Sequence, residues 1–299
     1  MCPMNECQMK AYAKINLGLD VVRRLENGYH EVRMVMQTVD IFDELTLTRI
    51  PLDATGASKP QITVTADSGE IPTDENNLIY KAAKLMMEQY DIRESVRIHL
   101  QKNIPIAAGM AGGSTDAAAT LKGINRLFDL SADRETLMKL GVKIGADVPY
   151  CILGGTALAE GIGEKLTPLP EAPEVFLLVA KPDINVSTKY VYEHLDAEGI
   201  VKHPDIDGMV RAIELGSLQG ILERMDNVLE SVTVKVHPVI STIKERMKEL
   251  GAVGSLMSGS GPTVFGIFLE KESAENAYGK FLADDLAKQV FVTTFHNYL

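Results

Sequence analysis

The chain has 299 residues, enough for one large domain or two smaller ones with a packed core. Its net charge of −11 argues against a nucleic-acid partner, because such partners are bound by basic surfaces. No apolar run is long enough for a membrane span or a signal peptide, and the three cysteines fit no zinc or disulfide spacing, which indicates a cytoplasmic protein.

The N-terminal region predicts a β-hairpin. Apolar and polar residues alternate over Met9–Val22, as in a strand with one buried face. Another strand is predicted over Glu31–Ile41, and the Asn27-Gly28 pair between them is a strong hairpin signal, since both residues tolerate positive φ. Lys14 and Asn16 stand two residues apart on the polar face, so their side chains point the same way. A solvated surface and the wall of a cleft explain that pair equally well.

Strands and helices follow one another through the rest of the first half. Strands are predicted over Asp43–Ile50, Gln61–Ala66, Val96–Gln101 and Thr156–Gly161, and helices over Leu78–Tyr90, Ala117–Phe128 and Ser131–Gly141. The segment Pro51–Pro60 is expected to be a loop. Asp74 or Asn76 is the expected N-cap of the helix that begins at Leu78.

A second domain is expected to begin between Gly163 and Pro173, where glycines and prolines interrupt the pattern. The predicted domains are therefore residues 1–165 and 166–299. Later strands are predicted over residues 175–181, 263–269 and 290–294, and helices over 187–195, 207–214, 218–224, 239–250 and 272–286. Early strands and late helices with mixed connections indicate an α+β fold rather than a doubly wound sheet.

The stretch Asn103–Ala119 is dense in glycine and alanine and lies between a predicted strand and a predicted helix. Ser114 is the expected N-cap of that helix. The first turn of a helix attracts anions through its unpaired N–H groups and its dipole, and glycines let an anion approach the backbone. A phosphate cradle is therefore favoured over the ordinary alternative, a capped helix after a flexible loop. The spacing fits neither the P-loop, the dinucleotide fingerprint nor the protein-kinase loop.

Pro105–Ala119 (PIAAGMAGGSTDAAA) resembles the central motif of the GHMP small-molecule kinases, which act on galactose, homoserine, mevalonate or phosphomevalonate. Three further segments match the family in order, namely the strand around Lys14, Gly145–Pro149 and Ser258–Thr263. The resemblance implies a two-domain fold with mixed or antiparallel sheets and an active site in the cleft between the domains. It also implies ATP as the phosphate donor and Mg²⁺ bridging its phosphates, without a visible carboxylate cage for the metal.

The resemblance assigns nucleotide binding to Pro105–Thr115, a segment that we call the cradle, and to one residue before the Leu78 helix. The assigned residues are Asn77, Pro105, Ile106, Ala107, Ala108, Gly109, Met110, Ala111, Gly112, Gly113, Ser114 and Thr115. Ala107, Ala108 and Ala111 stand where some relatives have glycine. Backbone N–H donors remain at these positions, so we expect phosphate binding to be retained.

The resemblance assigns catalysis to Lys14 and Asp147. During phosphoryl transfer the acceptor hydroxyl loses its proton, and an aspartate within hydrogen-bond reach can take that proton or orient the hydroxyl. A nearby lysine keeps the aspartate ionised and stabilises the forming alkoxide. Outside this family, Lys14 would be an ordinary surface lysine of a strand and Asp147 the N-cap of a helix, a role that is compatible with catalysis.

Three short motifs separate the branches of the superfamily. The residues AKINL at 13–17, NGYH at 27–30 and GADVPY at 145–150 are most similar to the branch that phosphorylates the 2-hydroxyl of a cytidine-diphosphate-linked methylerythritol in non-mevalonate isoprenoid synthesis. The substrate-binding residues implied are Asn16, Tyr29, His30, Asp147 and Thr188. The alternatives are another GHMP kinase, of the homoserine or mevalonate type, and a non-catalytic nucleotide-binding regulator. A monomer or a homodimer is expected.

Overall fold

The computed structural model describes residues 5–52 and 59–297, and the chain forms two compact units. The first unit comprises Met1–Ala13, Ile41–Ile104 and Ala111–Leu153, and the second comprises Lys14–Asp40, Pro105–Met110 and Gly154–Leu299. Strands β1 (Glu6–Arg24) and β2 (His30–Ile50) each contribute residues to both units. The domain boundary expected at residue 165 stays a prediction, and most of the expected Pro51–Pro60 loop lies outside the described residues.

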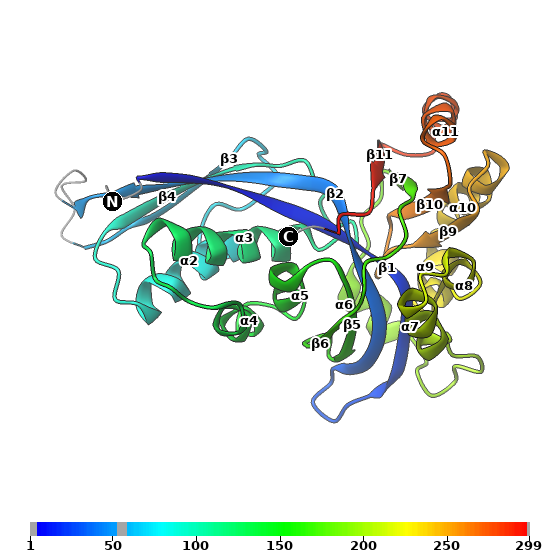
Figure 1. Ribbon diagram of the computed structural model, residues 1–299, viewed down its shortest axis with the longest axis horizontal. Coiled ribbons are helices and arrows are strands. Elements are labelled where there is room, and N and C mark those ends of the chain that lie inside the picture. The colour runs from blue at the N-terminus through cyan, green and yellow to red at the C-terminus, as the bar shows by residue number, and fades with distance from the viewer. Residues whose placement is uncertain (1–4, 53–58, 298–299) are drawn as a thin grey trace. The chain divides into compact units, whose positions relative to one another are not determined.

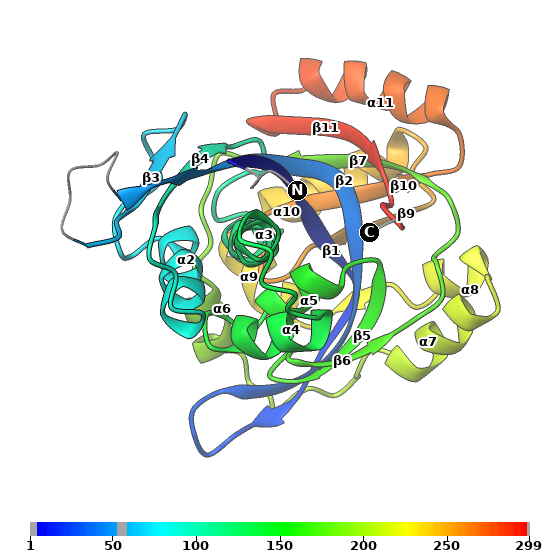
Figure 2. The ribbon, with the colours of Figure 1, turned by 60° about the vertical axis from the view of Figure 1, so that its left-hand side comes forward.

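The first unit is a layer of strands covered by helices. Strand β4 (Ser95–Gln101) runs antiparallel to β2, with Glu44 opposite Gln101, and parallel to β3 (Ile62–Ala66). Figures 1 and 2 show α2 (Leu78–Gln89) and α3 (Gly112–Leu127) side by side on one side of these strands. The other helices of this unit are α4 (Arg134–Val142) and α5 (Val148–Leu153).

The core of the first unit lies between these strands and helices. Fully buried side chains come from each layer, and they include Leu45, Leu47, Ile98, Leu100, Ile79, Met86, Leu121 and Ile124. Small residues on α3 allow the helix to pack closely, since an added Cβ at Gly123 would lie 2.8 Å from Leu47. The apolar alternation of the sequence therefore identified the buried faces of these strands.

Helix α3 begins at Gly112 rather than at Ala117. The predicted N-cap is wrong, because Ser114 lies inside the helix and the N-cap is Ala111, at φ 58° with no side-chain hydrogen bond. The low helix propensity of consecutive glycines hides this start in the sequence. A long-range bond helps to fix the turn instead, with Thr115 Oγ1 donating to Tyr12 O over 2.8 Å. The first turn of α3 thus has no side-chain cap at Ala111 and is held by the bond from Thr115.

The second unit contains a four-stranded antiparallel sheet in the order β11-β7-β10-β9. Its strands are β7 (Phe176–Lys181), β9 (Gly254–Met257), β10 (Val264–Phe268) and β11 (Gln289–Thr294). Figure 1 shows α10 (Val239–Glu249) and α11 (Lys271–Ala283) on the same side of this sheet. These elements are confirmed to within a few residues, except for β9, which the sequence pattern did not predict.

The remaining elements of the second unit are short. They are β5 (Thr156–Gly161), β6 (Lys165–Pro168), β8 (Asp226–Asn227), α6 (Thr188–His194), α7 (Ile206–Glu214), α8 (Leu218–Leu222) and α9 (Glu230–Val236). β5 runs antiparallel to β2, with Val32 opposite Gly161, and β8 runs parallel to β1, with Gly18 opposite Asp226. The sequence pattern misses β6, β8 and α9, because such short elements depend on packing rather than on their own periodicity.

The predicted hairpin between β1 and β2 is confirmed. Leu25 N–H donates to Tyr29 O over 2.8 Å, and Gly28 has a φ of 84°. The two separate strands predicted over Glu31–Ile41 and Asp43–Ile50 are wrong, since β2 is continuous. Asp43, the first residue of the second predicted strand, is fully buried inside β2 and accepts from two backbone N–H groups.

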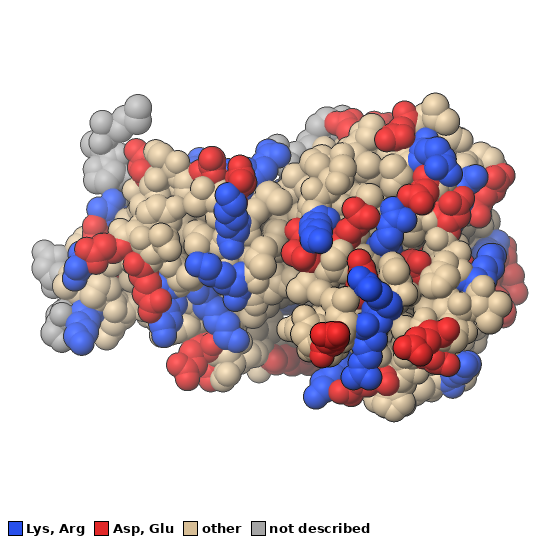
Figure 3. Space-filling view, turned by 90° about the horizontal axis from the view of Figure 1, so that it is seen from below, with Lys and Arg blue, Asp and Glu red and all other residues tan. Residues whose placement is uncertain are grey.

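Charged side chains of both signs are interspersed on the face of the molecule shown in Figure 3. The net charge of −11 is therefore not gathered into a single acidic patch on that face. Within residues 5–52 and 59–297, no helix combines the length and the apolar character that crossing a bilayer requires.

Candidate active site

Lys14 and Asn16 form a buried polar pair on β1. Lys14 Nζ donates to Asn16 Oδ1 over 2.7 Å and to Gly109 O over 3.2 Å. The exposed fraction is 5% for Lys14 and 0% for Asn16, so the solvated-surface interpretation of this strand face is wrong. Asn16 Nδ2 donates to Met34 Sδ over 3.3 Å. Both described acceptors of Lys14 are neutral, so within residues 5–52 and 59–297 no carboxylate pairs with its ammonium.

Gly109 brings the cradle against the Gly/Ser loop, which is Ser258–Gly261. Ser258 Oγ donates to Gly109 O over 3.0 Å. Gly109 has a φ of 71°, and an added Cβ would lie 2.3 Å from Ser258 O, closer than any side chain tolerates. An added Cβ at Gly259 would lie 3.1 Å from Gly109 O and 3.5 Å from Lys14 Nζ. Glycines at these two positions therefore gather Lys14, the cradle backbone and the loop within the second unit.

Polar side chains from three elements hold the Gly/Ser loop. Asn227 Nδ2 donates to Gly259 O over 2.8 Å, and Thr233 Oγ1 donates to Ser260 O over 3.1 Å. Thr188, a predicted substrate residue at the start of α6, has its hydroxyl oxygen 2.8 Å from that of Ser260. Sequence reasoning missed Asn227 and Thr233, because neither stands in one of the matched motifs.

The cradle backbone is left-handed at three positions. Ala107, Gly109 and Ala111 have φ values of 51°, 71° and 58°. The alanines at 107 and 111 therefore adopt a conformation that favours glycine, at a cost of about 1–2 kcal/mol per residue. Ala111 leads directly into the first turn of α3, which has no side-chain cap. An uncapped first turn of this kind is an anion-binding element.

Asp147 stands directly before α5 in the first unit. Its backbone carbonyl accepts from Cys151 N–H over 3.0 Å, so the residue begins the helix. Its half-buried carboxylate makes no hydrogen bond or ion pair with any residue that the structure describes. The carboxylate is therefore open to a ligand. Lys14 belongs to the second unit, and the joint action of the two residues is part of the function proposed below.

The predicted base-binding residues stand at the end of the hairpin and at the start of β2. Tyr29 is 59% exposed, and the ring of the half-buried His30 lies 5.1 Å from that of Tyr192 between centroids. Burial lowers the pKa of His30, and the nearby Arg24 lowers it further, so the ring is neutral at pH 7. A neutral imidazole can both donate and accept. Sequence reasoning missed Tyr192, whose one signal is an aromatic side chain shortly after Thr188.

Asn77 is the N-cap of α2, so the predicted caps Asp74 and Asn76 are wrong. Asn77 Oδ1 accepts from Ile79 N–H over 2.8 Å, and its Nδ2 donates to Pro72 O over 2.6 Å. The residue is 7% exposed. Both ends of its amide are thus engaged in shaping the start of α2, and its contact with a nucleotide stays a prediction.

Replacing Asn77 by alanine is expected to destabilise the first unit by about 1–2 kcal/mol, because the start of α2 loses its side-chain cap and the carbonyl of Pro72 loses its donor. Urea unfolding followed by far-UV circular dichroism measures the change. The matched control is Asp133→Ala, which removes the more exposed cap of α4. An unchanged stability together with a raised KM for ATP would contradict the structural role and leave Asn77 with nucleotide binding alone.

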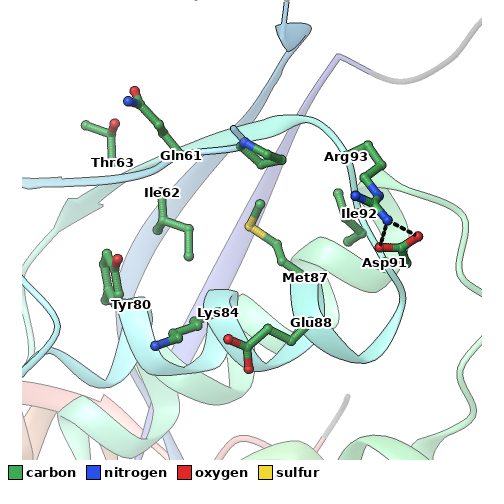
Figure 4. Close-up of a pocket in the computed structure, with 11 residues that line it drawn as sticks. Gln61, Ile62, Thr63, Tyr80, Lys84, Met87, Glu88, Asp91, Ile92 and Arg93 are labelled. Atoms are coloured by element: carbon green, nitrogen blue, oxygen red, sulfur yellow. Dashed lines mark hydrogen bonds and ion pairs between the residues drawn. The ribbon is translucent and has the colours of Figure 1, made fainter. Parts of the chain in front are cut away.

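A groove of about 600 Å³ opens between α2 and the edge strand β3 (Figure 4). Its lining includes Tyr80, Lys84 and Met87, and Arg93 pairs with Asp91 over 2.7 Å at one end. None of the residues predicted to bind nucleotide or substrate lines this groove. This groove therefore does not coincide with the predicted nucleotide and substrate residues.

Two family models match the chain, GHMP kinases N terminal domain over residues 77–155 and GHMP kinases C terminal over residues 209–286. The chain belongs to the GHMP kinases. This GHMP kinase is 53% identical over 290 residues to the 4-diphosphocytidyl-2-C-methyl-D-erythritol kinase of Lachnospira eligens, covering 97% of this chain and 98% of the relative. It is 51% identical over 292 residues to the protein of the same name from Lachnoclostridium phytofermentans, with 98% of each chain covered.

A crystal structure of 4-(cytidine 5'-diphospho)-2C-methyl-D-erythritol kinase matches this GHMP kinase with a TM-score of 0.81 and 31% sequence identity. The match covers 98% of this chain and 100% of the other. The predicted α+β fold of the GHMP kinases, with mixed sheets and helices, is confirmed. The cradle falls within the N-terminal family model and the Gly/Ser loop within the C-terminal one, so the motifs quoted from the sequence identified the family correctly.

Proposed function

We propose that this GHMP kinase transfers a phosphoryl group from ATP to the 2-hydroxyl of 4-diphosphocytidyl-2-C-methyl-D-erythritol in non-mevalonate isoprenoid precursor synthesis. The observation that carries the proposal is 53% identity along nearly the whole chain to a kinase named for that substrate. The chemistry of the site supports it. A buried Lys14 with neutral partners, an open carboxylate at Asp147 and an uncapped α3 are groups that suit phosphoryl transfer.

ATP binds through the backbone of the cradle in this proposal. The phosphates take the first turn of α3, where Gly113 leaves room, since an added Cβ would meet only Leu78 Cδ1, at 3.6 Å. Ala108 and Met110 are buried at 3% and 1% exposure, so their part is to hold the backbone rather than to offer side chains. The neighbouring Ile106, Ser114 and Thr115 complete the segment that carries the nucleotide.

Asp147 and Lys14 serve the transfer step. The carboxylate of Asp147 accepts the proton of the 2-hydroxyl or orients that hydroxyl toward the phosphoryl group. The ammonium of Lys14 balances the negative charge that gathers between the acceptor oxygen and the γ-phosphoryl group. The ammonium of Lys14 does not have to lose water during the reaction, because Asn16 and Gly109 already hold it in a buried position.

The cytosine end of the substrate binds at the start of β2. Tyr29 offers an exposed ring for stacking, and the neutral His30 offers one donor and one acceptor to the base. Tyr192 supports His30 from α6 and extends the aromatic surface. Thr188 offers a hydroxyl toward the rest of the substrate, and the fully buried Asn16 contributes to the site by holding Lys14.

The residues that the structure describes include no group of three or more His, Cys, Asp or Glu side chains that could hold a metal ion. A metal cage made by the protein therefore does not fit these residues. In our proposal Mg²⁺ arrives as the complex with ATP, as is usual for this ion.

The proposal is tested with purified protein, ATP, Mg²⁺ and three acceptor alcohols. ADP release is expected with 4-diphosphocytidyl-2-C-methyl-D-erythritol and not with homoserine or mevalonate. Turnover with homoserine or mevalonate but not with the cytidyl substrate would overturn the substrate assignment. ATP binding without turnover of any of the three would overturn the enzyme assignment in favour of a nucleotide-binding regulator.

A further inference from the structure

A buried ion cluster lies against the first turn of α3 in the first unit. Lys102 Nζ donates to Asp43 Oδ2 over 2.5 Å and to Asp116 Oδ2 over 2.9 Å. The side chains of Lys102, Asp43 and Asp116 are 7%, 0% and 5% exposed. Neither the proposed transfer step nor any of the matched motifs assigns a role to Asp43 or Lys102.

The cluster joins three parts of the first unit. Asp43, on β2, also accepts from the backbone N–H groups of Asn103 and Ile104 over 2.6 and 2.7 Å. Lys102 and Asp116 are 14 positions apart and stand on either side of the cradle, so the bond between them closes that segment into a loop. Asn103 and Ile104, which precede the cradle, therefore bind the buried carboxylate of Asp43 directly. Helix α3, which follows the cradle, is connected to the same carboxylate through Lys102.

The Lys102 ammonium packs directly against the first residue of α3. An added Cβ at Gly112 would lie 2.9 Å from Lys102 Nζ and 3.2 Å from Ile104 Cγ2. A shift of the ammonium is thus transmitted to the backbone of Gly112. Because α3 has no side-chain cap, this contact takes part in setting the direction of the N–H groups of its first turn.

We propose that Lys102 is a positioning residue for nucleotide binding: held by Asp43 and Asp116, its ammonium fixes the first turn of α3 in the shape that binds the phosphates of ATP. This inference rests on the proposed function, in which that turn holds the nucleotide. Lys102 acts through the backbone of Gly112 rather than by contact with the substrate.

The net charge of the cluster gives a second consequence. One oxygen of Asp116, Oδ1, is buried without a hydrogen-bond partner in the part of the chain that the structure describes. Burial raises the pKa of Asp116 to about 8, with Lys102 opposing and Asp43 adding to the rise, and these are the charged groups that act on it. Below that pH Asp116 is protonated and the cluster is neutral. Above it the cluster carries one net negative charge beside the phosphate site, which weakens the binding of an anion.

Three variants test the positioning role. Lys102→Met removes the ammonium but leaves the buried carboxyl groups of Asp43 and Asp116 without it. The double variant Lys102→Met/Asp116→Asn is therefore made as well, in which Asp43 keeps its two backbone donors. Asp116→Asn alone keeps a neutral cluster at every pH. The matched control is Arg49→Met, which breaks the ion pair with Glu94 elsewhere in the first unit.

The double variant is expected to raise KM for ATP by about tenfold or more while kcat at saturating ATP changes little, because a binding geometry is lost and the reacting groups remain. Arg49→Met leaves both constants near those of the wild type. KM for ATP rises between pH 7 and pH 9 in the wild type and stays flat in Asp116→Asn. A double variant with an unchanged KM for ATP would overturn the positioning role. The same pH dependence of KM in the wild type and Asp116→Asn would show that the charge of Asp116 does not act on ATP binding. Absence of turnover in the wild type itself would overturn the proposed function instead.

Discussion

Replacing Asp147 by asparagine is expected to lower kcat by about 10³-fold with the cytidyl substrate, within the range that a positioned acid–base group contributes. The amide keeps the size of the side chain and the start of α5 but cannot take the proton of the acceptor hydroxyl. KM for ATP should change little, since the nucleotide is held by the cradle backbone in our proposal. Steady-state kinetics with coupled detection of ADP measures both constants.

Two comparisons make the result specific to Asp147. Asp133→Asn alters another aspartate that begins a helix of the first unit, and it should leave kcat unchanged because Asp133 caps α4 and has no proposed contact with the substrate. Lys14→Met should lower kcat by a similarly large factor, since it removes the buried ammonium that we propose to act at the acceptor oxygen. An Asp147→Asn variant that keeps a tenth or more of the wild-type kcat would show that the carboxylate does not take the proton, since the amide oxygen can still accept a hydrogen bond from the hydroxyl and orient it.

The Lys14–Asn16 pair could be predicted from the sequence because it depends on a local rule. Side chains two residues apart on a strand lie on the same face, and this spacing places Lys14 and Asn16 where the observed 2.7 Å hydrogen bond can form. Whether the face was solvated could not be predicted in the same way. Its burial is completed by Gly109 and Ser258, which lie far along the chain and come close only because glycine allows the contact.

The residues that support the proposed site, such as Asp43 and Asn227, could not be predicted from the sequence for the same reason. The sequence pattern predicts Asp43 as the first residue of a strand and gives no sign that its carboxylate is buried. Its acceptors become necessary only when Lys102 and the backbone of Asn103 are brought beside it, about sixty positions later in the chain. Asn227 likewise gains its role from the carbonyl of Gly259. Sequence motifs therefore identified the groups that meet the ligand, and the pairing of distant segments determines what holds them.

The start of α3 shows how a local propensity can mislead. Consecutive glycines disfavour a helix, and Ser114 is a residue type that often precedes one, so the pattern places the helix start too late. The structure instead begins the helix at Gly112 after a left-handed Ala111. An alanine in this conformation is strained, and strain of this kind persists where surrounding contacts determine the backbone. The mistaken prediction thus falls on the segment that is proposed to bind phosphate.

Gly109→Ala is expected to be the most destabilising single substitution in the cradle. The left-handed backbone alone costs an alanine about 1–2 kcal/mol. The added Cβ would lie 2.3 Å from Ser258 O, so the Gly/Ser loop or the cradle must move, and overpacking of this kind costs about 1–3 kcal/mol more. Urea unfolding followed by far-UV circular dichroism suits this chain, which has no tryptophan to report by fluorescence.

Gly155→Ala separates the two contributions. Gly155 has a φ of 68°, nearly that of Gly109, but an added Cβ there would meet no atom within 4 Å. Gly155→Ala should therefore lose only the stability that the left-handed backbone costs an alanine. The difference in the free energy of unfolding between the two variants then measures the contact between the cradle and the Gly/Ser loop. Equal losses of stability in Gly109→Ala and Gly155→Ala would mean that the cradle and the Gly/Ser loop move apart with no loss in the free energy of unfolding.

The Gly109→Ala substitution also tests how the packing of the second unit supports the proposed chemistry. The carbonyl of Gly109 accepts hydrogen bonds from both Lys14 and Ser258, so a shifted cradle withdraws one acceptor from the buried ammonium. Lys14 then loses part of the support that holds its charge in place, and kcat should fall in Gly109→Ala beyond what the loss of folded protein explains. In Gly155→Ala, kcat per folded molecule should stay at the wild-type value, because the backbone around Lys14 is untouched.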